Sequence, residues 1–198
     1  MFDRHIYPVQ ARLLQPLAAR LARLGVSADA VTVFGFLVGI AALPLLATQH
    51  YWAALAAILA NRFFDGLDGA IARCTQATQR GAFLDIAFDF VFYAGVPLGF
   101  ALADPAANAL AAAVLLFAFM GTATSFLAFA AARQGVASAD YPAKGIYYLG
   151  GLTEGAETIG VFVAMCVWPQ SFPILALVFA ALCGVTAVMR WWWGWRNL

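Results

Sequence analysis

The chain has 198 residues, of which 64% are hydrophobic and 11% charged, and its formal net charge is +1. Soluble domains are about 45–50% apolar, so this composition indicates a polytopic membrane protein. The small net charge argues against a nucleic-acid binder, which needs a basic face. Three scattered cysteines, Cys74, Cys166 and Cys183, have no metal-binding spacing and predict neither a disulfide framework nor a zinc site.

The N-terminal region predicts an amphipathic helix over residues 8–24, "PVQARLLQPLAARLARL". Its leucines recur at helical spacing and the arginines fall elsewhere, which is typical of a helix lying on a membrane surface. The leucines of this stripe are Leu13, Leu14, Leu17, Leu21 and Leu24. The alternative is that the segment is a basic flank of the first span.

Six apolar segments are long enough to cross a bilayer, which takes about 20 helical residues. They lie near 31–48, 52–72, 82–102, 107–132, 145–167 and 172–192. We therefore predict an all-α integral membrane protein, one domain over residues 1–198, with six transmembrane helices and the surface helix. No internal repeat or linker divides the chain.

The basic residues predict the orientation of these spans. With both termini in the cytoplasm, ten of them fall on the cytoplasmic side or at its edge, and the opposite loops contain no Lys or Arg. The ten are Arg4, Arg12, Arg20, Arg23, Arg73, Arg80, Arg133, Lys144, Arg190 and Arg196. Arg62 remains, inside the second span.

Four aspartates stand in the stretch "NRFFDGLDGAIARCTQATQRGAFLDIAFDF", residues 61–90. Asp65 and Asp68 are three residues apart, and Asp85 and Asp89 are four apart, so each pair shares one face of a helix. The second and third spans are antiparallel neighbours joined by a short loop. The four carboxylates are therefore expected to converge in the cytoplasmic half of the membrane.

Such a cluster must be neutralised, because an acidic residue near the bilayer centre costs about 2.5–3.5 kcal/mol. Arg62 and Arg73 offset two charges at most. Mg²⁺ or Mn²⁺ fits better, since hard cations prefer carboxylate oxygens, and a two-metal site suits phosphoryl transfer. The alternatives are solvated loop acids, a structural ion-pair cluster or a cation-transport pathway.

The residues of this stretch resemble the signature of the CDP-alcohol phosphotransferases, membrane enzymes of phospholipid synthesis. The pattern here is Asp65-x2-Asp68-Gly69-x2-Ala72-Arg73-x7-Gly81-x3-Asp85-x3-Asp89. The resemblance implies transfer of a phosphatidyl group from CDP-diacylglycerol to a small polar alcohol, with release of CMP. It also implies a homodimer, in the cytoplasmic (inner) membrane of a bacterium, with the active site facing the cytoplasm.

The resemblance further implies a role for each matching residue. One divalent cation is held by Asp65, Asp68 and Asp85, and a second by Asp65, Asp85 and Asp89, of which Asp89 is also the general base. Contacts to the CDP-lipid are implied for Asp29, Thr32, Gly69, Arg73 and Thr78. The upstream segment "GVSADAVT" departs from the family in having Ala28 where proline is usual. Asp29 has an alternative role as the N-cap of the first span.

The same signature leaves other reactions open. One is a soluble CDP-alcohol donor with a lipid acceptor. Another is an intramembrane prenyltransferase, although its Asp-rich motifs stand on well-separated helices of a longer chain.

The sequence indicates the acceptor alcohol less clearly than the CDP-lipid donor. Candidate acceptor contacts are Arg80, Arg133, Lys144, Tyr148, Glu154 and Glu157. The basic residues suit a phosphate-bearing alcohol, and the two glutamates suit hydroxyls or an ammonium. "TEGAET" stands where family members that use inositol phosphate resemble one another in an Arg-rich stretch, which argues against that acceptor. Alternatively, the glutamates only brace the fifth span.

Overall fold

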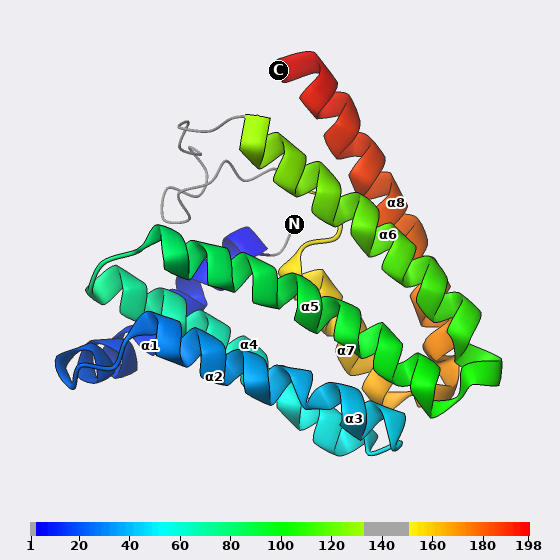
Figure 1. The fold of residues 1–198 in the computed structure, drawn as a ribbon, viewed down its shortest axis with the longest axis horizontal. Helices are drawn as coiled ribbons and strands as arrows, with labels where there is room; N and C mark the ends of the chain where they lie inside the picture. Colours follow the sequence, from blue (N-terminus) through cyan, green and yellow to red (C-terminus); the bar gives the residue numbers. More distant parts are fainter. Residues whose placement is uncertain (1–2, 133–150) are drawn as a thin grey trace.

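The protein is described here from a computed structural model, which defines residues 3–132 and 151–198. These residues form helices joined by short connections, with no strand among them (Figure 1). The helices are α1 Asp3–Arg23, α2 Ala28–Ile40, α3 Ala42–Ala47, α4 Tyr51–Cys74, α5 Gln79–Ala103, α6 Pro105–Ala132, α7 Gly155–Val167 and α8 Phe172–Asn197, with the 3-10 turn η2 Pro169–Ser171 before α8.

Local sequence signals set the ends of the helices that carry the site. Gly25 has a φ of +80°, and with the bond from Val26 N–H to the Leu21 carbonyl it closes α1. Ser27 then caps α2 by accepting from Ala30 N–H at 3.2 Å. Thr78 caps α5 in the same way, through Gly81 N–H at 2.9 Å. Asp29 is therefore not the cap of α2, and that alternative is wrong.

Four helical segments of the described residues are long and apolar enough to cross a membrane. They are Ala28–Ala47 (α2 and α3), Gln79–Ala103, Pro105–Ala132 and Pro169–Asn197. The helix α4 has 24 residues, but every window of 18 within it contains Arg62, Asp65 and Asp68. The six predicted spans are thus not confirmed as a set, because the second carries the site's charges.

The fifth predicted span, 145–167, differs from the observed helix. Residues 145–150 lie outside the described part of the chain, and 151–154 are not helical. The helix α7 begins at Gly155, because Glu154 caps its start, and it has 13 residues. Apolar composition alone predicted a span too long at its N-terminal end.

Aromatic side chains fill the main core, which lies between α3, α4, α5, α6, α7 and α8. Phe92, Phe100, Phe162 and Phe172 are almost completely buried there. Outward side chains are apolar as well: Leu110 and Phe117 of α6 are 79% and 82% exposed. Apolar groups on both the inside and the outside suit a protein whose surroundings are lipid tails.

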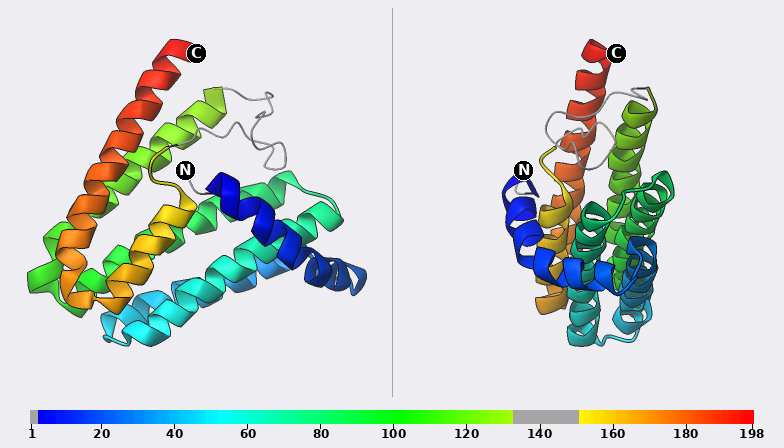
Figure 2. Two further views of the ribbon diagram at one scale, coloured as in Figure 1. Left: turned by 180° about the vertical axis from the view of Figure 1, so that it is seen from behind. Right: turned by 90° about the vertical axis from the view of Figure 1, so that its left-hand side faces the viewer.

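The helix α1 lies across α4, as the view from behind shows (Figure 2). Leu14 and Leu21 of the predicted stripe pack against a small cluster around Leu67 and Ile71. Leu13, Leu17 and Leu24 instead point outward, with exposed fractions of 74%, 40% and 72%. The stripe is thus divided between α4 and the surroundings, and contact of its outer part with a membrane stays a prediction.

Candidate active site

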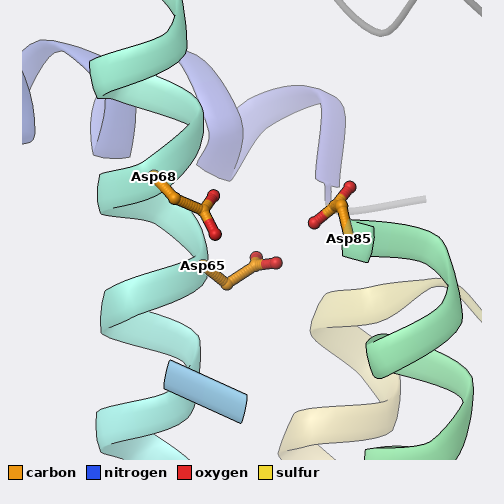
Figure 3. Close-up of side chains that lie close together, drawn as sticks. All are labelled: Asp65, Asp68 and Asp85. Carbon is orange, nitrogen blue, oxygen red and sulfur yellow. The ribbon is translucent and has the colours of Figure 1, made fainter. Parts of the chain in front are cut away.

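Three of the four aspartates come together where α4 and α5 face each other. Asp65 and Asp68 project from α4, and Asp85 projects toward them from α5 (Figure 3). One carboxylate oxygen from each lies within 4.8 Å of the other two. Oxygens this close, all from carboxylates, form a donor set that a hard divalent cation can bridge.

Asp68 provides a second indication of a cation at this place. Its side chain is 6% exposed, and its Oδ2 atom has no hydrogen-bond partner in the described part of the chain. Buried polar atoms are almost always paired, because an unpaired one loses its hydration without compensation. The residues present therefore fit a metal ion, for which this oxygen is a ready ligand.

Asp89 lines the same pocket but is held by an arginine. Arg62 Nη2 donates to Asp89 Oδ1 at 2.6 Å, and Arg62 Nη1 lies 3.6 Å from Asp65 Oδ2. Thr32 and Phe36 of α2 and Phe88 of α5 complete the wall around the carboxylates. Because the arginine occupies Asp89, the assignment of this residue as a metal ligand stays a prediction.

Sequence reasoning missed the residues that surround Arg62. Asn61 Oδ1 accepts from Arg62 Nε and Nη2 at 3.0 and 2.7 Å, and the Tyr93 hydroxyl oxygen accepts from Nη1 at 3.0 Å. The signal was present in the sequence, because Arg62 is the one basic residue that the predicted topology places away from the cytoplasmic side and its edge. The neighbouring asparagine gave no further sign.

The predicted nucleotide contacts lie around the cytoplasmic ends of α2, α4 and α5 as the predicted topology orients them. Arg73 stacks back on its own helix, since a Cβ on Gly69 would lie 3.4 Å from Arg73 Nη1. Thr32 lines the carboxylate pocket, and Thr78 caps α5. These four positions border one region, and their contacts to a nucleotide stay a prediction.

Asp29 and Arg80 form an ion pair that the sequence did not reveal. Arg80 Nε and Nη2 donate to Asp29 Oδ2 at 2.8 and 2.5 Å, although the two residues stand 51 positions apart. The sequence predicts Arg80 as a contact to the acceptor alcohol and Asp29 as a contact to the CDP-lipid. The pair joins α2 to α5 beside Gly81, so the two assignments concern one place on the molecule.

The remaining acceptor candidates are placed only in part. Arg133, Lys144 and Tyr148 lie outside the described residues. Glu154 and Glu157 form a capping box, in which each side chain accepts from the other residue's backbone N–H; Glu154 N–H donates to Glu157 Oε2 at 3.2 Å. They therefore mark the start of α7 rather than sharing a face along it.

Replacing Glu157 by Gln distinguishes the two roles of this glutamate. An amide oxygen can still cap α7, so a purely bracing residue should leave turnover within about twofold of wild type. If Glu157 binds the ammonium group of the acceptor, the substitution should instead raise the KM of serine or ethanolamine at least about tenfold, which steady-state kinetics would detect. Glu157→Ala is the matched variant, because it removes the side chain that accepts from Glu154 N–H, at a cost of about 0.5–1.5 kcal/mol for one hydrogen bond.

Comparison with known proteins gives matches over nearly the whole chain, beyond the residues of the site. The sequence profile of CDP-alcohol phosphatidyltransferases matches residues 26–195. The inner membrane protein YnjF of Escherichia coli is 50% identical over 200 residues, covering 100% of this chain and 97% of the relative. A phosphatidylinositol phosphate synthase of Mycobacteroides abscessus is 31% identical and is matched over 91% of this chain and 83% of the relative.

Solved structures show the same fold. The phosphatidylinositol phosphate synthase of Mycobacterium tuberculosis with CDP-DAG bound matches with a TM-score of 0.76 at 22% identity, over 93% of this chain and 94% of that one. The same enzyme with manganese and citrate also gives a TM-score of 0.76, at 23% identity, over 92% of this chain and 88% of that one. With the profile match and the carboxylate cluster, these findings lead to one conclusion: the chain belongs to the CDP-alcohol phosphatidyltransferase family, membrane transferases of substituted phosphate groups in phospholipid synthesis.

Proposed function

We propose that the protein transfers a phosphatidyl group from CDP-diacylglycerol to the hydroxyl of a small polar alcohol and releases CMP. The observation that carries the proposal is the cluster of Asp65, Asp68 and Asp85 inside a chain of this family, with an Asp68 oxygen that no other described residue hydrogen-bonds. The bound lipid donor of the solved relative supports the choice of donor.

Two divalent cations, Mg²⁺ or Mn²⁺, complete the proposed site. Asp65, Asp68 and Asp85 would hold one, and Asp65, Asp85 and Asp89 the second. When bound, such ions neutralise the diphosphate and stabilise charge on the attacking and leaving oxygens. The manganese complex of a relative with the same fold supports this choice of metal.

The chain's own residues have distinct tasks in the proposed reaction. Asp89 accepts the proton of the acceptor hydroxyl. The alcohol oxygen forms a bond to the phosphorus that carries the diacylglycerol, and the bond from that phosphorus to the CMP oxygen breaks. Arg73 binds the diphosphate, and the absence of a side chain on Gly69 leaves room for the nucleotide against α4. Thr32, Thr78 and Asp29 lie around the same opening.

The membrane position follows from the same reasoning. The lipid tails of the donor stay in the bilayer while the alcohol and CMP exchange with water. The charge pattern favours the cytoplasmic side of an inner membrane for this exchange, and the E. coli relative's name supports that membrane. A homodimer, expected from the family, is part of the proposal.

Release of CMP by the purified protein tests the function. The protein is supplied with CDP-diacylglycerol, Mg²⁺ or Mn²⁺, and glycerol 3-phosphate, serine, inositol, inositol phosphate, ethanolamine or choline in turn. Inositol phosphate is tested first, because two relatives are named phosphatidylinositol phosphate synthase and archaetidylinositol phosphate synthase. The segment "TEGAET" argues against this acceptor. We expect CMP with one of these acceptors.

Two other results would change the assignment. CMP formed only from CDP-choline or CDP-ethanolamine with diacylglycerol would mean that donor and acceptor are exchanged. No CMP from either combination would overturn the proposed reaction and leave only the family's fold.

A further inference from the structure

Arg62 is a partly buried cation inside the acidic site, and the family signature does not include it. Its side chain is 18% exposed and that of Asp89 is 30% exposed. The 2.6 Å bond to Asp89 and the 3.6 Å approach to Asp65 place one positive charge between two of the four carboxylates. The site therefore carries a cation of its own.

Several neighbouring groups bind the Arg62 guanidinium and fix the conformation of its side chain. Asn61 accepts two of its hydrogen bonds and Tyr93 accepts a third. The group also lies over the rings of Phe92 and Tyr93, at 5.2 and 5.4 Å from their centroids. A planar fork with five donors suits this arrangement, and a lysine ammonium does not.

The asparagine that holds Arg62 is itself fixed by α2. Asn61 Nδ2 donates to the Gly35 carbonyl at 3.0 Å. A Cβ on Gly39 would lie 2.6 Å from the same nitrogen, so α2 passes directly over Asn61. The chain of contacts runs from α2 through Asn61 and Arg62 to Asp89 on α5.

We propose that Arg62 is a positioning residue: a resident counter-cation that holds Asp89 in place for the acceptor hydroxyl and competes with divalent metal for that carboxylate. The role of Asp89 as base rests on the proposed function, whereas the competition for its carboxylate is argued from the bond to Arg62 and from the neighbouring carboxylate cluster.

Two opposite effects follow from removing this cation. Without Arg62, Asp89 no longer shares its carboxylate between the guanidinium and the second proposed metal ion, and the positive charge that repels incoming metal is gone, so metal binds more tightly. At the same time the carboxylate loses the partner that orients it, so transfer becomes slower. A residue that merely supported the fold of the site would weaken metal binding and transfer together.

The test compares wild type with Arg62→Ala in two assays. Titration with Mn²⁺, followed by the electron paramagnetic resonance of the free ion, should show an affinity roughly three- to tenfold higher in the variant. Steady-state CMP release should show kcat lower by about 10- to 100-fold with the KM of the acceptor little changed. Arg196→Ala is the matched control, because Arg196 stacks on Trp192 at the end of α8, and its loss should change neither quantity.

Arg62→Lys covers the case in which the alanine variant does not fold. It keeps the charge but not the fork, so its Mn²⁺ affinity should stay near wild type while kcat falls. Looser Mn²⁺ binding in Arg62→Ala, or unchanged kcat in either variant, would overturn the proposal. The Mn²⁺ assay needs no turnover, so an inactive wild type would refute the proposed reaction while the competition between Arg62 and metal was still decided.

Discussion

Replacing Asp68 by Asn is expected to abolish binding of the divalent cation proposed for Asp65, Asp68 and Asp85, and CMP release with it. Asp68 is 6% exposed and brings to the cluster an oxygen that has no hydrogen-bond partner among the described residues. An amide of the same shape keeps the packing of α4 but loses the charge and one anionic ligand. Turnover should fall by at least about 100-fold. This loss is larger than is typical for residues that contact a metal ligand but not the metal itself.

Thermal unfolding gives a readout that does not depend on turnover. Mn²⁺ at about 100 times the dissociation constant of a site should stabilise the wild type by about 2.7 kcal/mol for that site. The shift should be smaller in Asp68→Asn, because only the ion proposed for Asp65, Asp85 and Asp89 can still bind. In EDTA the variant should be as stable as wild type or more so, because the like charges of Asp65 and Asp68 no longer face each other.

Asp104→Asn is the matched control for that experiment. Asp104 lies at the turn from α5 to α6, where it accepts from Ala107 N–H at 3.1 Å, and asparagine caps a helix equally well. Its metal-dependent shift and its turnover should equal those of the wild type. A Mn²⁺ shift in Asp68→Asn as large as that of the wild type would contradict the assignment of this carboxylate as a ligand.

The sequence was sufficient to predict the gathering of Asp65, Asp68 and Asp85. Spacings of three and four residues put side chains on one helical face, and a short loop forces neighbouring helices to be antiparallel. Both rules act locally, so they can be applied without knowing the rest of the fold. The helical class and the approximate positions of α2 to α6 follow from the same local patterns.

The partners of the charged residues could not be predicted in the same way. Arg62 reaches Asp89 and Arg80 reaches Asp29 across 27 and 51 residues of sequence. Which long side chain meets which carboxylate depends on how α2, α4 and α5 cross, and helix spacing rules do not specify the crossing. For the same reason the leucine stripe of α1 was predicted as one face, although α4 takes only part of it.

The start of α7 shows a different limit. Hydropathy sums over a window and ignores hydrogen bonds at helix ends, so "GGLTEGAET" was included in a span. Glu154 and Glu157 stand three apart, the spacing of a capping box, but that spacing also fits two residues on one helical face. The pattern alone leaves the choice open, and the backbone hydrogen bonds decide it.

Asp89→Asn is expected to stop turnover while leaving the site assembled. If Asp89 takes the proton of the acceptor, its loss should lower kcat by about 10²- to 10⁴-fold, the usual range for a general base. The cluster of Asp65, Asp68 and Asp85 remains, so Mn²⁺ should still bind, and CDP-diacylglycerol should still protect the variant from thermal unfolding. Single-turnover CMP release, with binding measured in parallel, separates these effects.

The choice of asparagine rather than alanine matters because of Arg62. The amide oxygen of asparagine can still accept the bond that now runs from Arg62 Nη2 at 2.6 Å, whereas alanine would leave a guanidinium that is 18% exposed without that partner. Removing one member of a partly buried charge pair leaves the other charge uncompensated, so Asp89→Ala should unfold earlier than Asp89→Asn. Equal turnover in Asp89→Asn and wild type would place the base elsewhere. Equal loss of turnover in both variants, with stability lost only in Asp89→Ala, would separate the chemical task of this carboxylate from its structural one.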